Sequence, residues 1–190
     1  LGLEPYMELT GLAYQVTPTR SPDGQPRVNS EKMYENMMHK FKFGNMNIPG
    51  IYIDENLMRM CRTHRMMFAQ LAEQLLRENQ REKALEVLDY AEEQLPGYNI
   101  PYDYTSASMA AMYFMLNEDE KAVAIMDNVA NTCVEYLRFA SSLDRSRREL
   151  METTTSRQMA VLGYVLQTCE RNGQSELVEK YYGDYAAYVK

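Results

Sequence analysis

From Asp54 onward, apolar-face residues follow one another at alternating intervals of four and three positions. These residues are Leu57, Cys61, His64, Phe68, Leu71 and Leu75. Because this spacing places them on one face of a helix that Asp54 can cap, the pattern predicts a long amphipathic helix over 55–78. A second periodic stretch runs to Leu95, where Pro96-Gly97 ends it. The two stretches together predict an antiparallel helix hairpin.

The same arrangement returns twice in the rest of the chain. The pattern predicts helices over 104–116 and 120–140, and then over 146–171 and 175–189, with a polar turn inside each pair. Helix hairpins that recur at intervals of about 34 residues are typical of stacked helical repeats. We therefore expect an all-α fold in which residues 54–190 form a solenoid of about three hairpins.

The first hairpin resembles a tetratricopeptide repeat in the spacing of its large and small residues. The matching positions are Phe68, Leu71, Ala72, Leu75, Ala84, Leu88, Ala91 and Pro96. The second hairpin keeps part of this pattern, at Met109, Ala110, Tyr113, Ala122 and Met126, and the third keeps little beyond its two helices. The resemblance implies a tetratricopeptide-like solenoid with a degenerate terminal cap.

Residues 1–53 follow a different pattern. Alternation at Leu12, Tyr14 and Val16 predicts a short strand, and a loop rich in proline and glycine follows it. Ser30 can cap a short helix over 31–43 that Gly44 ends. The extended piece at 51–53 either pairs with the 12–16 strand or docks on the helices. We expect residues 1–53 to form an arm that packs on the repeats, in one structural unit overall.

Composition and charge exclude several functional classes. The residues are 45% hydrophobic and 25% charged, as in ordinary globular domains, which argues against general disorder. A net charge of -7 has the wrong sign for a nucleic-acid partner. The longest apolar stretches, Met109–Leu116 and Met159–Leu166, are too short for a membrane span of about 20 residues, so we expect no membrane insertion. Three widely spaced cysteines argue against a disulfide framework.

Few residues point to chemistry. Cys61-x-x-His64 has the spacing of half a metal site, but both residues lie on the apolar stripe, which favours a buried thiol and a hydrogen-bonded core imidazole over zinc. The sequence contains no glycine-rich phosphate loop, nucleophile elbow or HExxH motif. We expect no metal, no cofactor and no catalytic residue in this chain.

Two groups of arginines are candidates for binding an anionic group. Arg59, Arg62 and Arg65 recur every three residues on the long helix. A second group, Arg145, Arg147, Arg148 and Arg157, lies in the predicted fifth helix. Solvated faces paired with nearby acids are the more common explanation for such groups.

A partner surface is expected on the first helix of each hairpin. In the two better repeats it would carry Met66, Ala69, Gln70, Glu73, Leu76, Tyr104, Ala107, Ala111 and Phe114. The second part of this set is strongly apolar, so it either holds an extended peptide or is covered by the chain's own arm. We favour the arm, because its apolar residues need a place to be buried.

Four segments carry a resemblance to a known family. They are Leu9–Tyr14, Met33–Gly44, Ile51–Asn56 and Arg59–Arg65, of which Lys40-Phe-Lys-Phe-Gly44 and Tyr52-Ile53-Asp54-Glu55 are the most distinctive. Over almost its whole length the chain resembles the C-terminal soluble region of large multi-span membrane proteins of Bacteroidetes. This domain-of-unknown-function family is described as protein O-mannosyltransferase-like.

The resemblance implies a parent enzyme that takes a sugar from a lipid-linked donor, with its catalytic residues outside this chain. The tail would then be an accessory module of an inner-membrane protein, on the extracytoplasmic (periplasmic) side. It would hold an acceptor protein or peptide, a partner subunit or the parent's own membrane domain. The absent initiator methionine fits a piece of a longer protein. The alternative is an independent scaffold or cell-surface adaptor with no transferase link.

Overall fold

The computed structural model describes residues 2–188. The chain divides into two compact units, unit 1 (Leu1–Pro101) and unit 2 (Tyr102–Lys190). Helices dominate both units, and unit 1 also contains a small three-stranded sheet. The prediction of a mainly helical chain is therefore confirmed, whereas the sheet is larger than the sequence pattern predicted.

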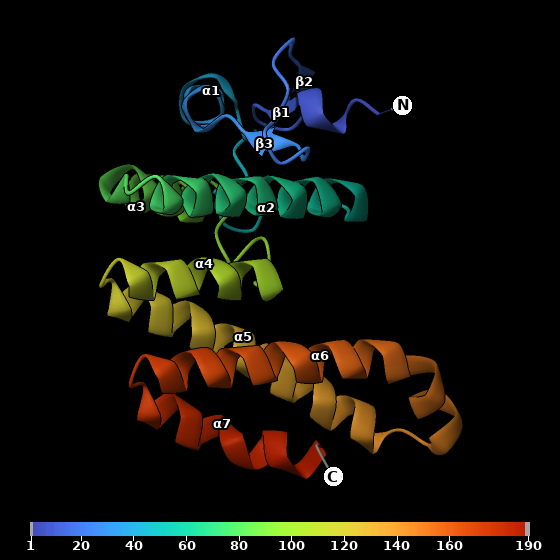
Figure 1. Cartoon of the computed structure of the whole chain (residues 1–190). Helices are drawn as coiled ribbons and strands as arrows, with labels where there is room; N and C mark the ends of the chain where they lie inside the picture. Colours follow the sequence, from blue (N-terminus) through green and yellow to red (C-terminus); the bar gives the residue numbers. More distant parts are fainter. Residues whose placement is uncertain (1, 189–190) are drawn as a thin grey trace. The chain divides into compact units, whose positions relative to one another are not determined.

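Two antiparallel helices, α2 (Glu55–Arg77) and α3 (Arg81–Gln94), form the centre of unit 1 (Figure 1). The Asp54 side chain accepts hydrogen bonds from the backbone N–H groups of Asn56 and Leu57, so it caps α2 as predicted. In the turn between the helices Asn79 has a φ of 59°, a left-handed conformation that asparagine tolerates better than most residues. The hydrophobic stripes of both helices are buried.

The sheet lies near the N-terminus. After a 3-10 turn (Glu4–Tyr6) it contains β1 (Met7–Leu9), β2 (Tyr14–Val16) and β3 (Arg27–Val28), in the order β2-β1-β3. Strand β1 pairs antiparallel with β2 and parallel with β3. The predicted strand at 12–16 is therefore present as β2, but its partner is β1 and not the 51–53 segment, which forms no strand.

The helical part of the arm is shorter than predicted, and its second half is a π-helical turn rather than an α-helix. An α-helix, α1 (Ser30–Tyr34), continues directly into a π-helical turn, Glu35–Lys40. The cap is Asn29, whose side chain accepts a hydrogen bond from the Lys32 N–H, and not Ser30 as the sequence suggested. The chain leaves helical conformation after residue 40, although the pattern predicted a helix up to 43.

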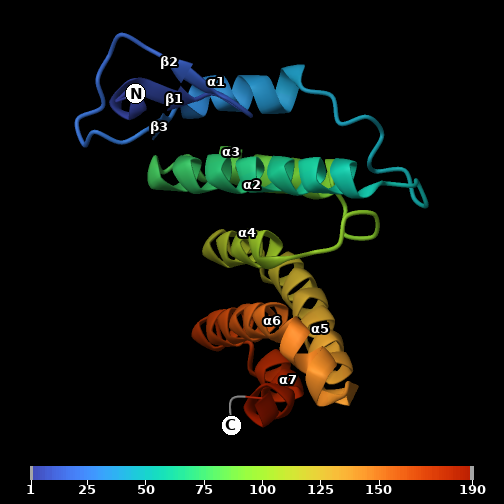
Figure 2. The same ribbon diagram turned by 90° about the vertical axis from the view of Figure 1, so that its right-hand side faces the viewer.

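The arm packs on the two long helices of unit 1. Met33 and Met37 are fully buried, and the Phe43 ring lies 5.5 Å from the rings of both His64 and Phe68. The Tyr34 hydroxyl donates a 2.5 Å hydrogen bond to Glu86 on α3. Figures 1 and 2 both show α1 and the sheet on one side of the α2–α3 pair.

A buried arginine links α2 to the chain after α3. The Arg65 side chain donates hydrogen bonds of 2.8 Å to the carbonyls of Leu95 and Ile100, and one of 3.0 Å to the carbonyl of Pro101. Arg65 is only 1% exposed. These bonds fix the irregular segment 95–101 against the middle of α2.

Over the residues that the structure describes, unit 2 consists of four helices. They are α4 (Tyr104–Met115), α5 (Asp119–Ser142), α6 (Arg145–Arg171) and α7 (Ser175–Tyr188). Helix α5 packs against the other three, and α6 and α7 form the last hairpin (Figure 1). The predicted bounds agree within a few residues, except that Val189 lies outside the described residues. None of the described helices is long and apolar enough to cross a membrane.

The first testable prediction concerns Arg65. Replacing it by methionine keeps an apolar stem but leaves three carbonyls without their charged donor. Arg65→Met should lower the free energy of unfolding by about 3–5 kcal/mol, as urea denaturation would measure. Arg62→Met, on the exposed side of the same helix, is the matched control and should change it by less than about 0.5 kcal/mol. Equal effects of the two substitutions would contradict the role given to Arg65.

Candidate functional site

The predicted partner surface on α2 is partly open. Met66 is 43% exposed and Glu73 is also exposed, whereas Gln70 and Leu76 are half-buried and Ala69 is buried. Gln70 and Glu73 line an open hollow of about 250 Å³ whose opposite wall comes from the sheet. The structure therefore places the chain's own arm along one edge of this surface, while Met66 stays accessible.

The predicted partner surface on α4 is not an open apolar groove. Ala107 and Phe114 are 0% and 5% exposed, and Ala111 is half-buried. Only Tyr104 is exposed, and its ring lies 5.2 Å from the ring of Tyr164 on α6. The expectation of a strongly apolar docking face is corrected here, because the small and aromatic residues of α4 belong to the packed core.

The expected three-arginine anion site on α2 is also corrected. Arg59 and Arg62 are exposed, and the Arg59 guanidinium donates a hydrogen bond to the Asn56 side chain. Arg65 is instead buried and bonds backbone carbonyls, as described above. A period of three residues per 3.6-residue turn rotates successive arginines around the helix, so the third one reaches the core side. At most two of the three can meet an anion in solution.

Cys61 and His64 do not form a metal site. Cys61 is 3% exposed, and burial raises the pKa of its thiol despite the nearby Arg65 charge. His64 is half-buried rather than in the core, with Nδ1 2.7 Å from the carbonyl oxygen of Met60 and the ring edge on Phe43. Within residues 2–188, no group of three His, Cys, Asp or Glu side chains is arranged to hold a metal ion.

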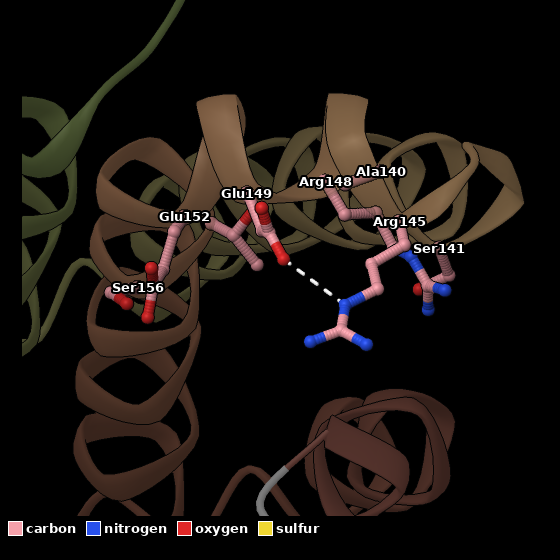
Figure 3. A pocket seen from close by; sticks show the side chains of 8 residues that line it. Ala140, Ser141, Arg145, Arg148, Glu149, Glu152 and Ser156 are labelled. Atoms are coloured by element: carbon pink, nitrogen blue, oxygen red, sulfur yellow. Dashed lines mark hydrogen bonds and ion pairs between the residues drawn. The ribbon is translucent and has the colours of Figure 1, made fainter.

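Two arginines of the second group, Arg145 and Arg148, line an open hollow of about 400 Å³ in unit 2, whereas Arg147 and Arg157 do not. Figure 3 shows Arg145 and Arg148 at one end of it and Glu152 and Ser156 at the other, with an ion pair of 3.1 Å between Arg145 and Glu149. Its rim is thus charged with both signs. The sequence indicated the arginines but not this hollow, which forms only where the end of α5 meets the start of α6.

The two cysteines of unit 2 are buried thiols with low reactivity. Cys133 and Cys169 are 2% and 0% exposed, and burial raises the pKa of each from its ordinary value of 9.0 to about 11. The Cys133 thiol also donates to the Gln158 side-chain oxygen at 3.1 Å. Because the thiolate is the nucleophile, neither residue is suited to covalent catalysis near neutral pH.

The raised thiol pKa values predict a loss of stability in alkali. The unfolded chain releases these protons above about pH 9, whereas the folded chain keeps them until pH 11. The stabilisation is therefore complete below the unfolded pKa and falls by about 1.4 kcal/mol per thiol for each pH unit between the two values. The urea concentration at the midpoint of unfolding should fall from pH 8 to pH 10, and it should fall further for the wild type than for the Cys133→Ala, Cys169→Ala double variant. Equal decreases would contradict the prediction.

Comparisons of the chain with known protein families, with curated proteins and with solved structures find no match.

Proposed function

We propose that this chain is a non-catalytic protein-interaction domain of a membrane-bound, protein O-mannosyltransferase-like glycosyltransferase. The parent enzyme would use a lipid-linked sugar donor, and this domain would lie on its extracytoplasmic side. The family resemblance of segments such as Lys40–Gly44 and Tyr52–Glu55 supports the link to the transferase. The domain's partner would be an acceptor protein or peptide, or the parent's own membrane domain.

The finer fold proposal is a tetratricopeptide-like arrangement of the helix hairpins. In its support, the small residues Ala72, Ala84 and Ala91 of the repeat pattern are at most 1% exposed, as expected where paired helices approach closely. The large residues Phe68, Leu71 and Leu88 are fully buried as well. The sheet and the π-helical turn are additions that the repeat pattern does not account for.

The observation that carries the interaction role is the partly open surface of α2. Here Met66 is exposed beside Gln70 and Glu73, at positions where hairpins of this kind receive a partner. Methionine adapts to differently shaped partners because its side chain is unbranched and polarisable. The hollow that Gln70 and Glu73 line, with polar groups on its rim, can receive one or two side chains of a bound segment.

Fractionation of native cells with an antibody against this chain tests the proposal. We expect a product much larger than 190 residues that stays in the membrane after alkaline extraction, because the parent would span the bilayer. A product of about 190 residues, released without detergent, would contradict the transferase link. It would instead favour the independent scaffold or cell-surface adaptor.

A further inference from the structure

Strand β2 has an outer edge that no other strand of the sheet covers. It lies at the rim of the three-stranded sheet, farther from α2 than β1 and β3 (Figure 2). Edge strands in natural proteins usually carry charged residues, proline or a bulge, which prevent another strand from pairing with them. The nine residues from Leu9 to Thr17 contain no charge and no proline. Apart from the short length of β2, which has three residues, the edge therefore lacks these protections.

The hydrogen bonds of β2 show which of its groups point outward. The Thr17 N–H donates to the Tyr6 carbonyl, and the Thr10 N–H donates to the Ala13 carbonyl. Ala13, Gln15 and Thr17 thus turn their backbone groups toward β1, because the direction alternates along a strand. The N–H and C=O groups of Tyr14 and Val16 point away from the sheet. Within residues 2–188, no hydrogen bond reaches these four groups.

The side chains on this edge are apolar and accessible. Tyr14 and Val16 are 49% and 57% exposed and lie on the same side of the strand, and Leu12, in the turn that joins β1 to β2, is 46% exposed. An occupant of the edge must therefore be an extended segment with apolar residues at every second position and without charge. Strand β2 itself has these properties.

We propose that a second copy of this chain pairs with the first through β2, across a two-fold axis at Gln15. The antiparallel register that joins the outward-pointing groups places Tyr14 of one copy opposite Val16 of the other. Both residues of each such pair exchange N–H···O=C bonds, which gives four hydrogen bonds across the interface. The two sheets become one continuous six-stranded sheet.

Side chains across the axis are compatible with this register. Tyr14 packs beside Val16 of the other copy, an aromatic and β-branched pair of the kind that stabilises antiparallel sheets. Gln15 meets Gln15 of the other copy, and neither side chain is charged, although each accepts a 3.5 Å hydrogen bond from Lys32 of its own copy. Four backbone bonds and two such pairs make a small interface, so the dimer depends on protein concentration.

A cysteine at the axis tests the register directly. Residues that face each other without hydrogen bonding have Cα atoms about 4.5 Å apart, within reach of a disulfide. Oxidised Gln15→Cys should therefore give a covalent dimer in high yield. Leu12→Cys is the control, because it is also exposed but lies in the turn between β1 and β2, outside the residues that pair across the axis. The three native cysteines are buried in both variants.

A proline at an outward position tests the backbone bonds. Val16→Pro removes one outward N–H and none of the bonds to β1, so sedimentation of this variant should show a monomer at concentrations where the wild type dimerises. Val16→Thr keeps the N–H and the β-branched shape and should still dimerise. Circular dichroism and urea denaturation of both variants would show whether the fold is intact.

Three results would overturn the proposal. One is a wild type that stays monomeric up to high micromolar concentrations, which would leave the edge to a strand from a different protein. Another is equal cross-linking of Gln15→Cys and Leu12→Cys. The third is a folded Val16→Pro variant that dimerises as well as the wild type does, which would place the contact elsewhere.

Discussion

The structure of unit 1 depends on one buried cation. A guanidinium cannot lose its proton inside a protein, so the burial of Arg65 is tolerated only because its N–H groups have acceptors. Leu95, Ile100 and Pro101 supply three carbonyl oxygens at 2.8–3.0 Å. These carbonyls also need donors, because the chain leaves helical conformation after α3 and its backbone groups lose their helical partners. The guanidinium thus supplies the donors that the carbonyls need, the carbonyls supply its acceptors, and the segment after α3 is held in one conformation.

This link leaves the rest of α2 free for other contacts. One side of the helix receives Phe43 and the arm, whose aromatic rings pack on Phe68 and His64. The arm contains another buried charge, Glu8, and this one also has its partners inside the unit. It forms an ion pair with Arg27 and accepts a hydrogen bond from Asn29. The Asn29 amide, and then the Arg27 guanidinium, lower the pKa of Glu8 despite its burial. Met66 remains accessible, which is why the interaction role is assigned to α2.

The sequence predicted what depends on local periodicity and missed what depends on distant partners. The bounds of α2 followed from apolar spacing and the Asp54 cap, and those of α5 from the polar turn before it and its apolar spacing, because burial repeats with each helical turn. Helical spacing places Arg65 nearer the apolar stripe than Arg59 and Arg62, but its role could not be predicted, since its acceptors lie 30 or more residues away. The pairing of β2 with β1 was missed because β1, Met-Glu-Leu, alternates over only three residues, which is too short a stretch to predict a strand. The open surface of α2 was only partly predicted, because helical spacing cannot show where the arm lies.

Unit 1 contains two kinds of polar group, the buried charges of Arg65 and Glu8 and the outward backbone groups of β2, and they differ in whether a partner can reach them. Arg65 and Glu8 are buried with their partners inside the unit, so they stabilise the fold and offer nothing to a ligand. The outward groups of Tyr14 and Val16 are exposed, so water can satisfy them in the isolated chain at little cost. When a paired strand replaces that water, each new hydrogen bond by itself adds little to the free energy of association. The additional free energy has to come from the apolar side chains beside them, and this is why an edge with Tyr14 and Val16 can hold a partner where a polar edge would not.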